Sequence, residues 1–301
     1  MIITRVGQIF LTNLDSLKKK KLLQTNISFT KIFDAKIFED ELYISSQIND
    51  ESKNCIVRTV FKAEINDEKL NFENFYQHKK CATGDNGGIM YFNENNKNLI
   101  ISIPDNEIKT TGKYDFPTNF FKINFDNKKF QELSKGHRNP QGLLITENNI
   151  VISTEHGPRG GDEINNIKFG KNYGWPISSY GEKYKDIFKN EKKFDYKKDH
   201  QTNGFEEPIY AFVPSIGISQ IIKVPNDFSF RWKNSFLITS LKARSIFRVN
   251  FDSDFSKIIT IEKIYVGKRI RDIEYSKNIK SFILALEDDG GYVGILKLKT
   301  N

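Results

Sequence analysis

Short apolar runs recur along the whole chain, and this pattern constrains the fold more than any other feature. Turns rich in Asn, Asp, Gly and Lys separate runs such as "NLIISI", "NIVIST", "SFLITS" and "SFILAL". The 3.6-residue spacing of a long amphipathic helix is almost absent. Runs of this length, broken at this spacing, are typical of an all-β sandwich, barrel or propeller.

A looser unit of strand, polar turn and strand also repeats. It is visible in "GGIMYFNENNKNLIISI", "QGLLITENNIVISTE" and "IRDIEYSKNIKSFILALEDD". A sandwich would end after about 100 to 200 residues, whereas these units continue through all 301 residues. We therefore predict a β-propeller of four-stranded antiparallel blades, forming a single domain over residues 1–301. The polar, Lys-rich stretch 181–204 breaks the pattern and is predicted to be a surface insertion.

Composition excludes several classes of function. A formal net charge of +8 would normally suggest nucleic acid as a binding partner. The lysines are scattered, however, and the one dense run, Lys18 to Lys21, has no aromatic-rich face beside it, so no nucleic-acid partner is predicted. No run of about 18 apolar residues predicts a membrane span. Cys55 and Cys81 are too few for a disulfide framework or a metal cluster, and whether they form one bridge stays open.

Gly and Pro, which permit unusual backbone conformations, and polar side chains are concentrated in residues 136–166, "GHRNPQGLLITENNIVISTEHGPRGGDEINN". Gly157-Pro158 and Gly160-Gly161 permit exposed carbonyl groups, and Asp162 and Glu163 add carboxylates. Such oxygen atoms suit Ca²⁺ better than zinc. Arg138 offers a planar fork to a carboxylate or a quinone oxygen. The alternative is a set of tight turns capped by Asx side chains.

The same stretch carries a family resemblance. The motifs "GHRNPQGL", "EHGPRGGDEIN" and "GKNYGWP", followed by "VPSIGIS", "LITSLKARSIFRV" and "GKRIRDI", closely resemble the soluble quinoprotein glucose/sorbosone dehydrogenases, especially their aldose dehydrogenase branch. The resemblance is strong over residues 136–181 and weak before residue 130. It implies a six-bladed β-propeller that binds pyrroloquinoline quinone (PQQ) and Ca²⁺.

The resemblance also implies a cofactor pocket of cationic and amide side chains: Arg138, Asn139, Gln141, Lys242, Arg269 and Arg271. Because this quinone carries three carboxylates, a preorganised cationic cage around it is physically reasonable. The carbonyl groups of Gly157 and Pro158 are implied to hold Ca²⁺. For Asp162, a place near the metal and a role as a turn cap both stay open. Tyr173 and Trp175 are expected to pack between blades rather than to contact substrate.

The implied catalytic positions match the family less well. Besides Arg138 beside the quinone, the chemistry requires a His general base and an Asp that orients it. The His position falls on Asp85 in "ATGDNGGIMYF", whereas the Asp is retained as Asp105 in "SIPDNE". A solvated Asp, with a pKa near 4, is a poor proton acceptor, so Asp85 would need a raised pKa to replace the His.

The histidines elsewhere in the chain do not supply the missing base. His78 and His200 are expected at the surface. His137 and His156 belong to the family motif, and they are expected to support the site or its turns.

Three hypotheses follow. The first is a PQQ- and Ca²⁺-dependent dehydrogenase that takes electrons from the C1 hydroxyl of a sugar, or from another polyol, and passes them through the quinone to an external acceptor. The second is a carbohydrate- or quinone-binding propeller that has lost the general base. The third is a propeller without a small ligand, in which internal carboxylates neutralise the cationic cluster.

The N-terminus departs from the family as well. It lacks the apolar region of a signal peptide, and "TRVGQIFLTN" resembles the end of the first blade. Either the sequence starts at an internal Met, which would hide an export signal and make a periplasmic location the family expectation, or the first blade is incomplete.

Overall fold

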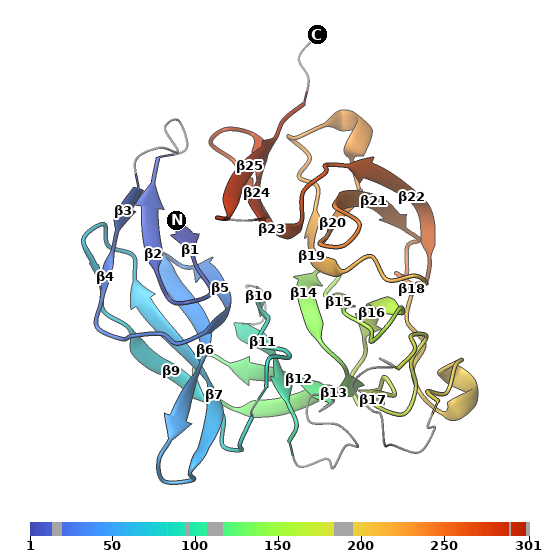
Figure 1. Cartoon of the computed structure of the whole chain (residues 1–301), viewed down its shortest axis with the longest axis horizontal. Coiled ribbons are helices and arrows are strands. Elements are labelled where there is room, and N and C mark those ends of the chain that lie inside the picture. Colours follow the sequence, from blue (N-terminus) through green and yellow to red (C-terminus); the bar gives the residue numbers. More distant parts are fainter. Residues whose placement is uncertain are drawn as a thin grey trace. The chain divides into compact units, whose positions relative to one another are not determined.

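The computed structural model describes residues 1–13, 20–82, 84–93, 97–106, 117–183, 195–288 and 290–298. The chain divides into two compact units, Met1–Glu132 and Leu133–Asn301. Figure 1 colours the first unit from blue to green and the second from green to red. The single domain over residues 1–301 stays a prediction.

The first unit is built from antiparallel sheets whose strands follow one another along the chain. Its first sheet has the order β1-β2-β3 (Ile2–Ile3, Ile9–Thr12, Lys20–Leu22). Its second has the order β5-β6-β7-β9 (Ile32–Phe38, Glu41–Asp50, Cys55–Glu64, Glu73–Gln77). Its third contains β10, β11 and β12 (Met90–Asn93, Asn98–Pro104, Thr118–Asn124). A short parallel pair joins β4 (Gln24–Thr25) to β8 (Lys69–Leu70).

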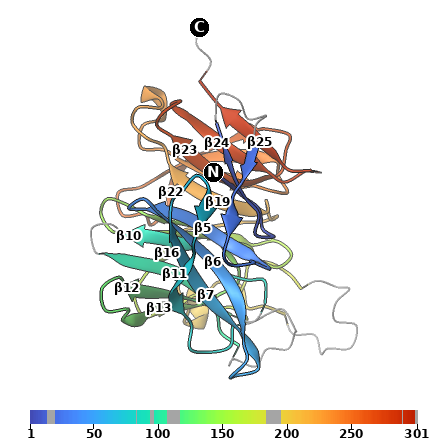
Figure 2. The ribbon, with the colours of Figure 1, turned by 90° about the vertical axis from the view of Figure 1, so that its left-hand side faces the viewer.

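Apolar side chains buried along the strands hold the sheets of this unit together. The long hairpin of β6 and β7 runs from the Glu41–Glu64 pair to the Asp50–Cys55 pair without a register shift (Figure 2). Tyr43 of β6 packs against Phe92 of β10 with ring centroids 4.6 Å apart, and Phe38 of β5 stacks on the same ring at 4.8 Å. Buried aromatic contacts of this kind hold the second sheet of the unit to the third.

The second unit repeats the arrangement. β13 (Phe130–His137) begins in the first unit, continues into the second and pairs there in parallel with β17 (Lys171–Asn172). The next sheet has the order β14-β15-β16-β18 (Pro140–Ile145, Val151–Glu155, Asp162–Ile167, Tyr210–Phe212). It is followed by β19-β20-β21-β22 (Ile218–Lys223, Phe236–Ser240, Ser245–Phe251, Ile258–Tyr265). The last sheet is β23-β24-β25 (Ile270–Ser276, Ser281–Leu286, Tyr292–Leu296).

The sheets are the blades of an all-β, six-bladed propeller of mostly four-stranded antiparallel sheets, so the predicted fold class is confirmed. The helical elements in the described parts are two 3₁₀ turns, η1 (Gln201–Asn203) and η2 (Phe230–Trp232). Within these ranges no helix is long and apolar enough to cross a membrane.

The structure bears on two further expectations, the pairing of the cysteines and the stretch 181–204. Cys55 and Cys81 form a disulfide, which answers the question that their number left open. The expected surface insertion at 181–204 is only partly correct. Residues 184–194 lie outside the described residues, but Tyr196 and His200, which flank Lys197–Asp199, are buried. Aromatic contacts draw both side chains inward, to Trp175 and Tyr180 respectively.

Candidate functional site

The turn between β13 and β14 presents Arg138 to a small cavity. Gly136 (φ +76°) precedes it, and a Cβ there would lie 2.1 Å from the side-chain oxygen of Asn172, so the close approach of these segments requires glycine. The cavity measures about 10 Å³, room for about one water molecule. It is lined by Gly136, Arg138, Glu155, His156, Gly157, Glu163, Tyr173, Trp175 and Ser179.

Arg138 is held at both its backbone and its guanidinium. Its backbone N–H donates to Glu155 Oε2 at 2.8 Å. Its Nη1 donates to the carbonyl oxygens of His156 and Gly157, at 3.2 and 2.9 Å. The indole ring of Trp175 lies 5.1 Å from its Cζ, within the range of a cation–π contact. Trp175 was expected only to pack between blades, and it also borders the cavity of Arg138.

The Glu155 carboxylate holds this turn in place. It is buried at the end of β15, with Oε1 3.0 Å from His137 Nδ1, and Ser134 Oγ lies 2.9 Å from the other ring nitrogen of His137. Burial by itself raises the pKa of Glu155. The neighbouring His137 and the hydrogen bond from Arg138 nevertheless hold that pKa below its ordinary value. An ionised carboxylate therefore fixes the Arg138 backbone.

Asp162 caps the turn that follows β15. Its Oδ1 accepts from the backbone N–H of Gly157 at 3.2 Å, and its Oδ2 accepts from that of Ile218, the first residue of β19, at 3.0 Å. Both carboxylate oxygens are therefore engaged by the backbone. Of the two roles left open for Asp162, the structure supports the cap.

His156 is the next residue after Glu155, and its backbone carbonyl oxygen accepts from Arg138 Nη1. Its Nε2 is buried and has no hydrogen-bond partner among the described residues. The pKa of His156 is lowered to about 4, mainly by burial and also by the positive charges of Arg138 and Arg271, against the opposing effect of Asp162. The charges of an arginine in the β13–β14 turn and of one on β23 therefore both act on this imidazole.

The remaining cofactor candidates form a second cluster, with one exception. Gln141 Nε2 donates to Asn139 Oδ1 at 3.0 Å, and Arg271 Nη1 donates to Gln141 Oε1 at 3.2 Å, which joins β14 to β23. Arg269 and Arg271 both pair with Glu287. Lys242 is exposed, and among the described residues no hydrogen bond or ion pair joins it to these arginines.

The structure argues against Asp85 as a general base. The carboxylate is 74% exposed, hydrogen-bonded to Lys31 Nζ and 3.8 Å from Arg5 Nη2. The hydrogen bond from Lys31 lowers the pKa of Asp85 below its ordinary value, because it stabilises the charged form. The raised pKa that a base would need at this position is therefore absent.

Asp105 lies elsewhere in the first unit. It follows β11, and its Oδ2 accepts from Asn119 Nδ2 at 3.3 Å. The same amide nitrogen lies 3.2 Å from Glu132 Oε2. These residues border a cavity of about 220 Å³ whose wall also includes His78, Phe121 and Phe130.

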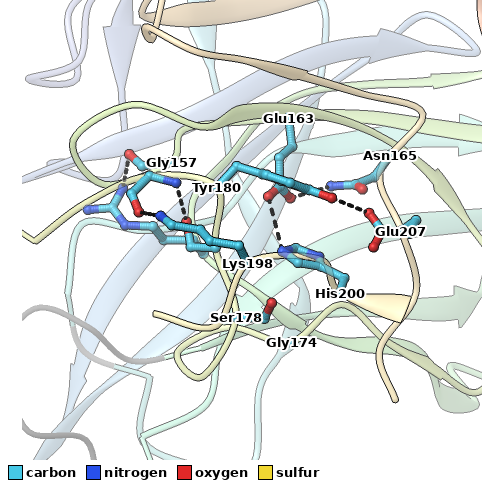
Figure 3. A network of polar contacts seen from close by, with 12 residues as sticks. Gly157, Glu163, Asn165, Gly174, Ser178, Tyr180, Lys198, His200 and Glu207 are labelled. Atoms are coloured by element: carbon cyan, nitrogen blue, oxygen red, sulfur yellow. Dashed lines mark hydrogen bonds and ion pairs between the residues drawn. The ribbon is translucent and has the colours of Figure 1, made fainter. Parts of the chain in front are cut away.

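Two histidines are not where the sequence placed them. His78 is buried, with its ring centroid 5.7 Å from that of Phe121 and 5.4 Å from that of Phe130. His200 is also buried. It stacks on Tyr180 at 5.2 Å, and its Nε2 lies 3.8 Å from Glu163 Oε1 (Figure 3). Both expectations of a surface position were wrong because aromatic partners remote in the sequence cover these rings.

Sequence reasoning missed two carboxylates that shape the site, Glu155 and Glu287. Glu155 and Glu287 directly follow the apolar strand runs "NIVIST" and "FILAL". This position at the end of a predicted strand was the feature of the sequence that could have identified them. Glu163 is buried beside Asn165, whose Nδ2 donates to its Oε2 at 3.3 Å (Figure 3). Burial, reinforced by the charge of Glu155, raises the pKa of Glu163 well above its ordinary value.

The donor set fits an anionic quinone better than it fits a metal. Gln141 links Arg271 to Asn139, the residue after Arg138, and the buried Nε2 of the nearby His156 has no partner among the described residues. Cationic forks of this kind suit carboxylates and quinone oxygens. For Ca²⁺, a Cβ on Gly157 would meet the carbonyl oxygens of Gly161 and Gly160 at 2.1 and 2.3 Å, so hard oxygens crowd this turn. Both Asp162 oxygens accept backbone N–H groups, so the main-chain oxygens of this turn are the first candidates for holding the ion.

Comparison with known proteins agrees with this picture. A sequence model of the family described as Glucose / Sorbosone dehydrogenase matches residues 33–295. The aldose sugar dehydrogenase YliI of Escherichia coli is 30% identical over 235 residues, which cover 72% of this chain and 61% of YliI. The chain thus spans about three fifths of that relative.

Solved structures share the fold. A crystal structure of a glucose dehydrogenase superposes with a TM-score of 0.78 at 22% identity, covering 98% of this chain and 92% of that one. The PQQ-bound aldose sugar dehydrogenase of Streptomyces coelicolor superposes with a TM-score of 0.65 at 17% identity, covering 96% and 90%. With a family match over most of its length and the fold of these enzymes, the chain belongs to the glucose/sorbosone dehydrogenase family.

Proposed function

We propose that the second unit binds a carboxylated quinone of the PQQ type and that the protein oxidises a sugar or another polyol. The observation that carries the proposal is the hydrogen-bonded chain from Arg271 through Gln141 to Asn139, the residue that directly follows Arg138. Two similar proteins support the choice of substrate class and cofactor. One is named an aldose sugar dehydrogenase, and the other is a PQQ-bound structure of such an enzyme.

Each residue has a distinct part in this proposal. When bound, the quinone would supply the two-electron acceptor for the sugar C1 hydroxyl. Arg138, whose backbone is fixed by Glu155 and whose Nη1 is fixed by two carbonyl oxygens, would place its guanidinium beside a quinone or substrate oxygen. Arg269, Arg271 and the exposed Lys242 would bind carboxylates. The carbonyl groups of Gly157 and Pro158 would hold Ca²⁺ as hard ligands.

The partners and the location are also proposals. A sugar is the substrate class of the named relatives, and electrons would leave to an external acceptor. The Cys55–Cys81 disulfide supports an oxidising compartment such as the periplasm.

Calorimetry tests the cofactor. The Ca²⁺-loaded protein should bind PQQ, and Arg269→Ala and Arg271→Ala should each weaken binding by about tenfold or more, as expected when a charge-assisted contact is lost. Arg248→Ala is the matched control, because Arg248 pairs with Glu262 on β21 and β22 without joining the cluster. An absence of binding, or equal loss in the control, would overturn the proposal.

Turnover is tested separately, with PQQ, Ca²⁺, an artificial electron acceptor and a panel of aldoses. Binding without turnover would favour the second candidate, a carbohydrate- or quinone-binding propeller. The ion pairs of Asp85 specifically support that candidate, since they keep the carboxylate ionised and weakly basic. Activity created by Asp85→His would support it, whereas loss of existing activity in Asp85→Asn would support the dehydrogenase.

A further inference from the structure

Glu287 occupies the cationic cluster proposed for the cofactor. The residue follows β24, and its backbone N–H donates to the Arg269 carbonyl oxygen at 2.8 Å, which fixes its position between the two arginines. Its Oε1 lies 3.2 Å from Arg269 Nη2, and its Oε2 accepts from Arg271 Nε at 2.5 Å and also pairs with Arg271 Nη2. A carboxylate of the protein thus already sits where a ligand carboxylate would bind.

The donors of Arg271 are largely committed. Nε and Nη2 face Glu287, and Nη1 donates to Gln141 Oε1 at 3.2 Å. A guanidinium has five N–H groups, of which adjacent pairs serve a bidentate carboxylate. A ligand that seeks the Nε–Nη2 edge of Arg271 must therefore displace Glu287.

Displacement is feasible because the ion pairs are partly solvated. The side chains of Arg269, Arg271 and Glu287 are 37, 39 and 43% exposed. Water screens such pairs, which makes each of them weak. Burial alone raises the pKa of Glu287, but the two arginines hold that pKa below its ordinary value, so the competing group is anionic at neutral pH.

We infer that Glu287 is a specificity-determining latch that competes with ligand carboxylates for Arg269 and Arg271 and thereby restricts the site to polyanions. When a ligand with a single carboxylate replaces Glu287, the binding free energy that it gains at these arginines about equals the free energy lost with the Glu287 ion pairs. The exchange therefore brings little net affinity. A ligand with several carboxylates makes the same exchange and gains additional contacts, for example at Arg138. This inference rests on the proposed function, because it concerns the same site.

The test compares Glu287→Gln with wild type by calorimetry, using PQQ, citrate and acetate. Gln preserves the shape and one acceptor but removes the charge. Glu287→Gln should bind PQQ and citrate about tenfold more tightly than wild type and should begin to bind acetate. Glu287→Asp, which keeps the charge, should stay within about threefold of wild type. Glu262→Gln, which removes the equivalent partner of Arg248, is the matched control and should change nothing.

A second readout separates failure of the latch from failure of the proposed function. The Arg271 Nε–H resonance should shift on citrate addition at lower concentration in Glu287→Gln than in wild type, whether or not PQQ binds. Equal citrate dependence in both proteins would overturn the latch. So would weaker PQQ binding in Glu287→Gln, since that result would mean that Glu287 orients the arginines for the ligand. Thermal unfolding of each variant verifies that it is folded.

Discussion

Glu155 accepts a hydrogen bond of 2.8 Å from the backbone N–H of Arg138, and both groups belong to the turn region that forms the candidate site. The carboxylate is 2% exposed, and its other oxygen lies 3.0 Å from His137 Nδ1. This buried carboxylate thus determines where the Arg138 backbone lies. A residue that positions another residue in this way is as necessary for function as the residues that contact the ligand.

Glu155→Gln should therefore destabilise the protein and weaken quinone binding together. Gln offers one acceptor oxygen where Glu155 offers two, so either Arg138 N–H or Asn165 Nδ2 would face an amide nitrogen. Removal of one partner from a buried charged pair typically costs about 3 to 5 kcal/mol. Urea denaturation measures the loss. Glu132→Gln, an exposed carboxylate of the first unit, is the control, and equal stability of the two variants would contradict the assignment.

Asp162→Asn separates the turn cap from a metal ligand. The cap joins Gly157 to Ile218 through both carboxylate oxygens, so an Asn should leave one of these N–H groups poorly satisfied. The expected loss of unfolding free energy is about 1 to 3 kcal/mol, with an unchanged midpoint in a Ca²⁺ titration. The opposite pattern, intact stability and weaker Ca²⁺ binding, would show that Asp162 is a ligand after all.

The sequence was sufficient to predict the blades, because short apolar runs between polar turns specify strands locally. The proximity of residues in the "GHRNPQG" and "RIRD" motifs was predicted as well, whereas their role toward a cofactor stays a proposal. Gln141 and Arg271 are 130 positions apart and still share a hydrogen bond. Local pattern alone could not have shown that contact. The family resemblance supplied it.

Other features were invisible because they depend on partners remote in sequence. The polar stretch around His200 looked solvated, yet Tyr180 and Glu163 cover that ring. Asp85 looked like a replacement base, but Lys31, far earlier in the chain, determines the direction of its pKa shift. Glu287 followed an apolar run without any motif of its own. Electrostatic roles of this kind depend on three-dimensional neighbours and not on residue type.

Removal of the Cys55–Cys81 disulfide should reduce stability without abolishing the fold. The bridge joins residues 26 positions apart, and loop-closure entropy for that length predicts a loss of about 3 kcal/mol. Urea denaturation of Cys55→Ser/Cys81→Ser should show this loss, and the wild type in reducing agent should match the variant. An unchanged unfolding midpoint in both samples would mean that the loop is held without the bridge.

Acid should destabilise the protein through His156, and the sign follows from its pKa. The folded pKa is about 4, whereas an unfolded histidine titrates near 6.5. Between these values the unfolded chain binds more protons than the folded one, so the free energy of unfolding falls as the pH is lowered from about 6.5 to about 4. The full difference amounts to roughly 3 kcal/mol. Denaturation curves across this range measure it.

His156→Gln provides the control for this pH dependence. The variant keeps a polar side chain of similar length but cannot titrate, so its stability should vary less with pH in this range than that of the wild type. Glu163, whose raised pKa contributes a slope of opposite sign, is present in both proteins and cancels in the difference. If the two proteins lose stability in parallel between pH 6.5 and 4, His156 is not the group responsible.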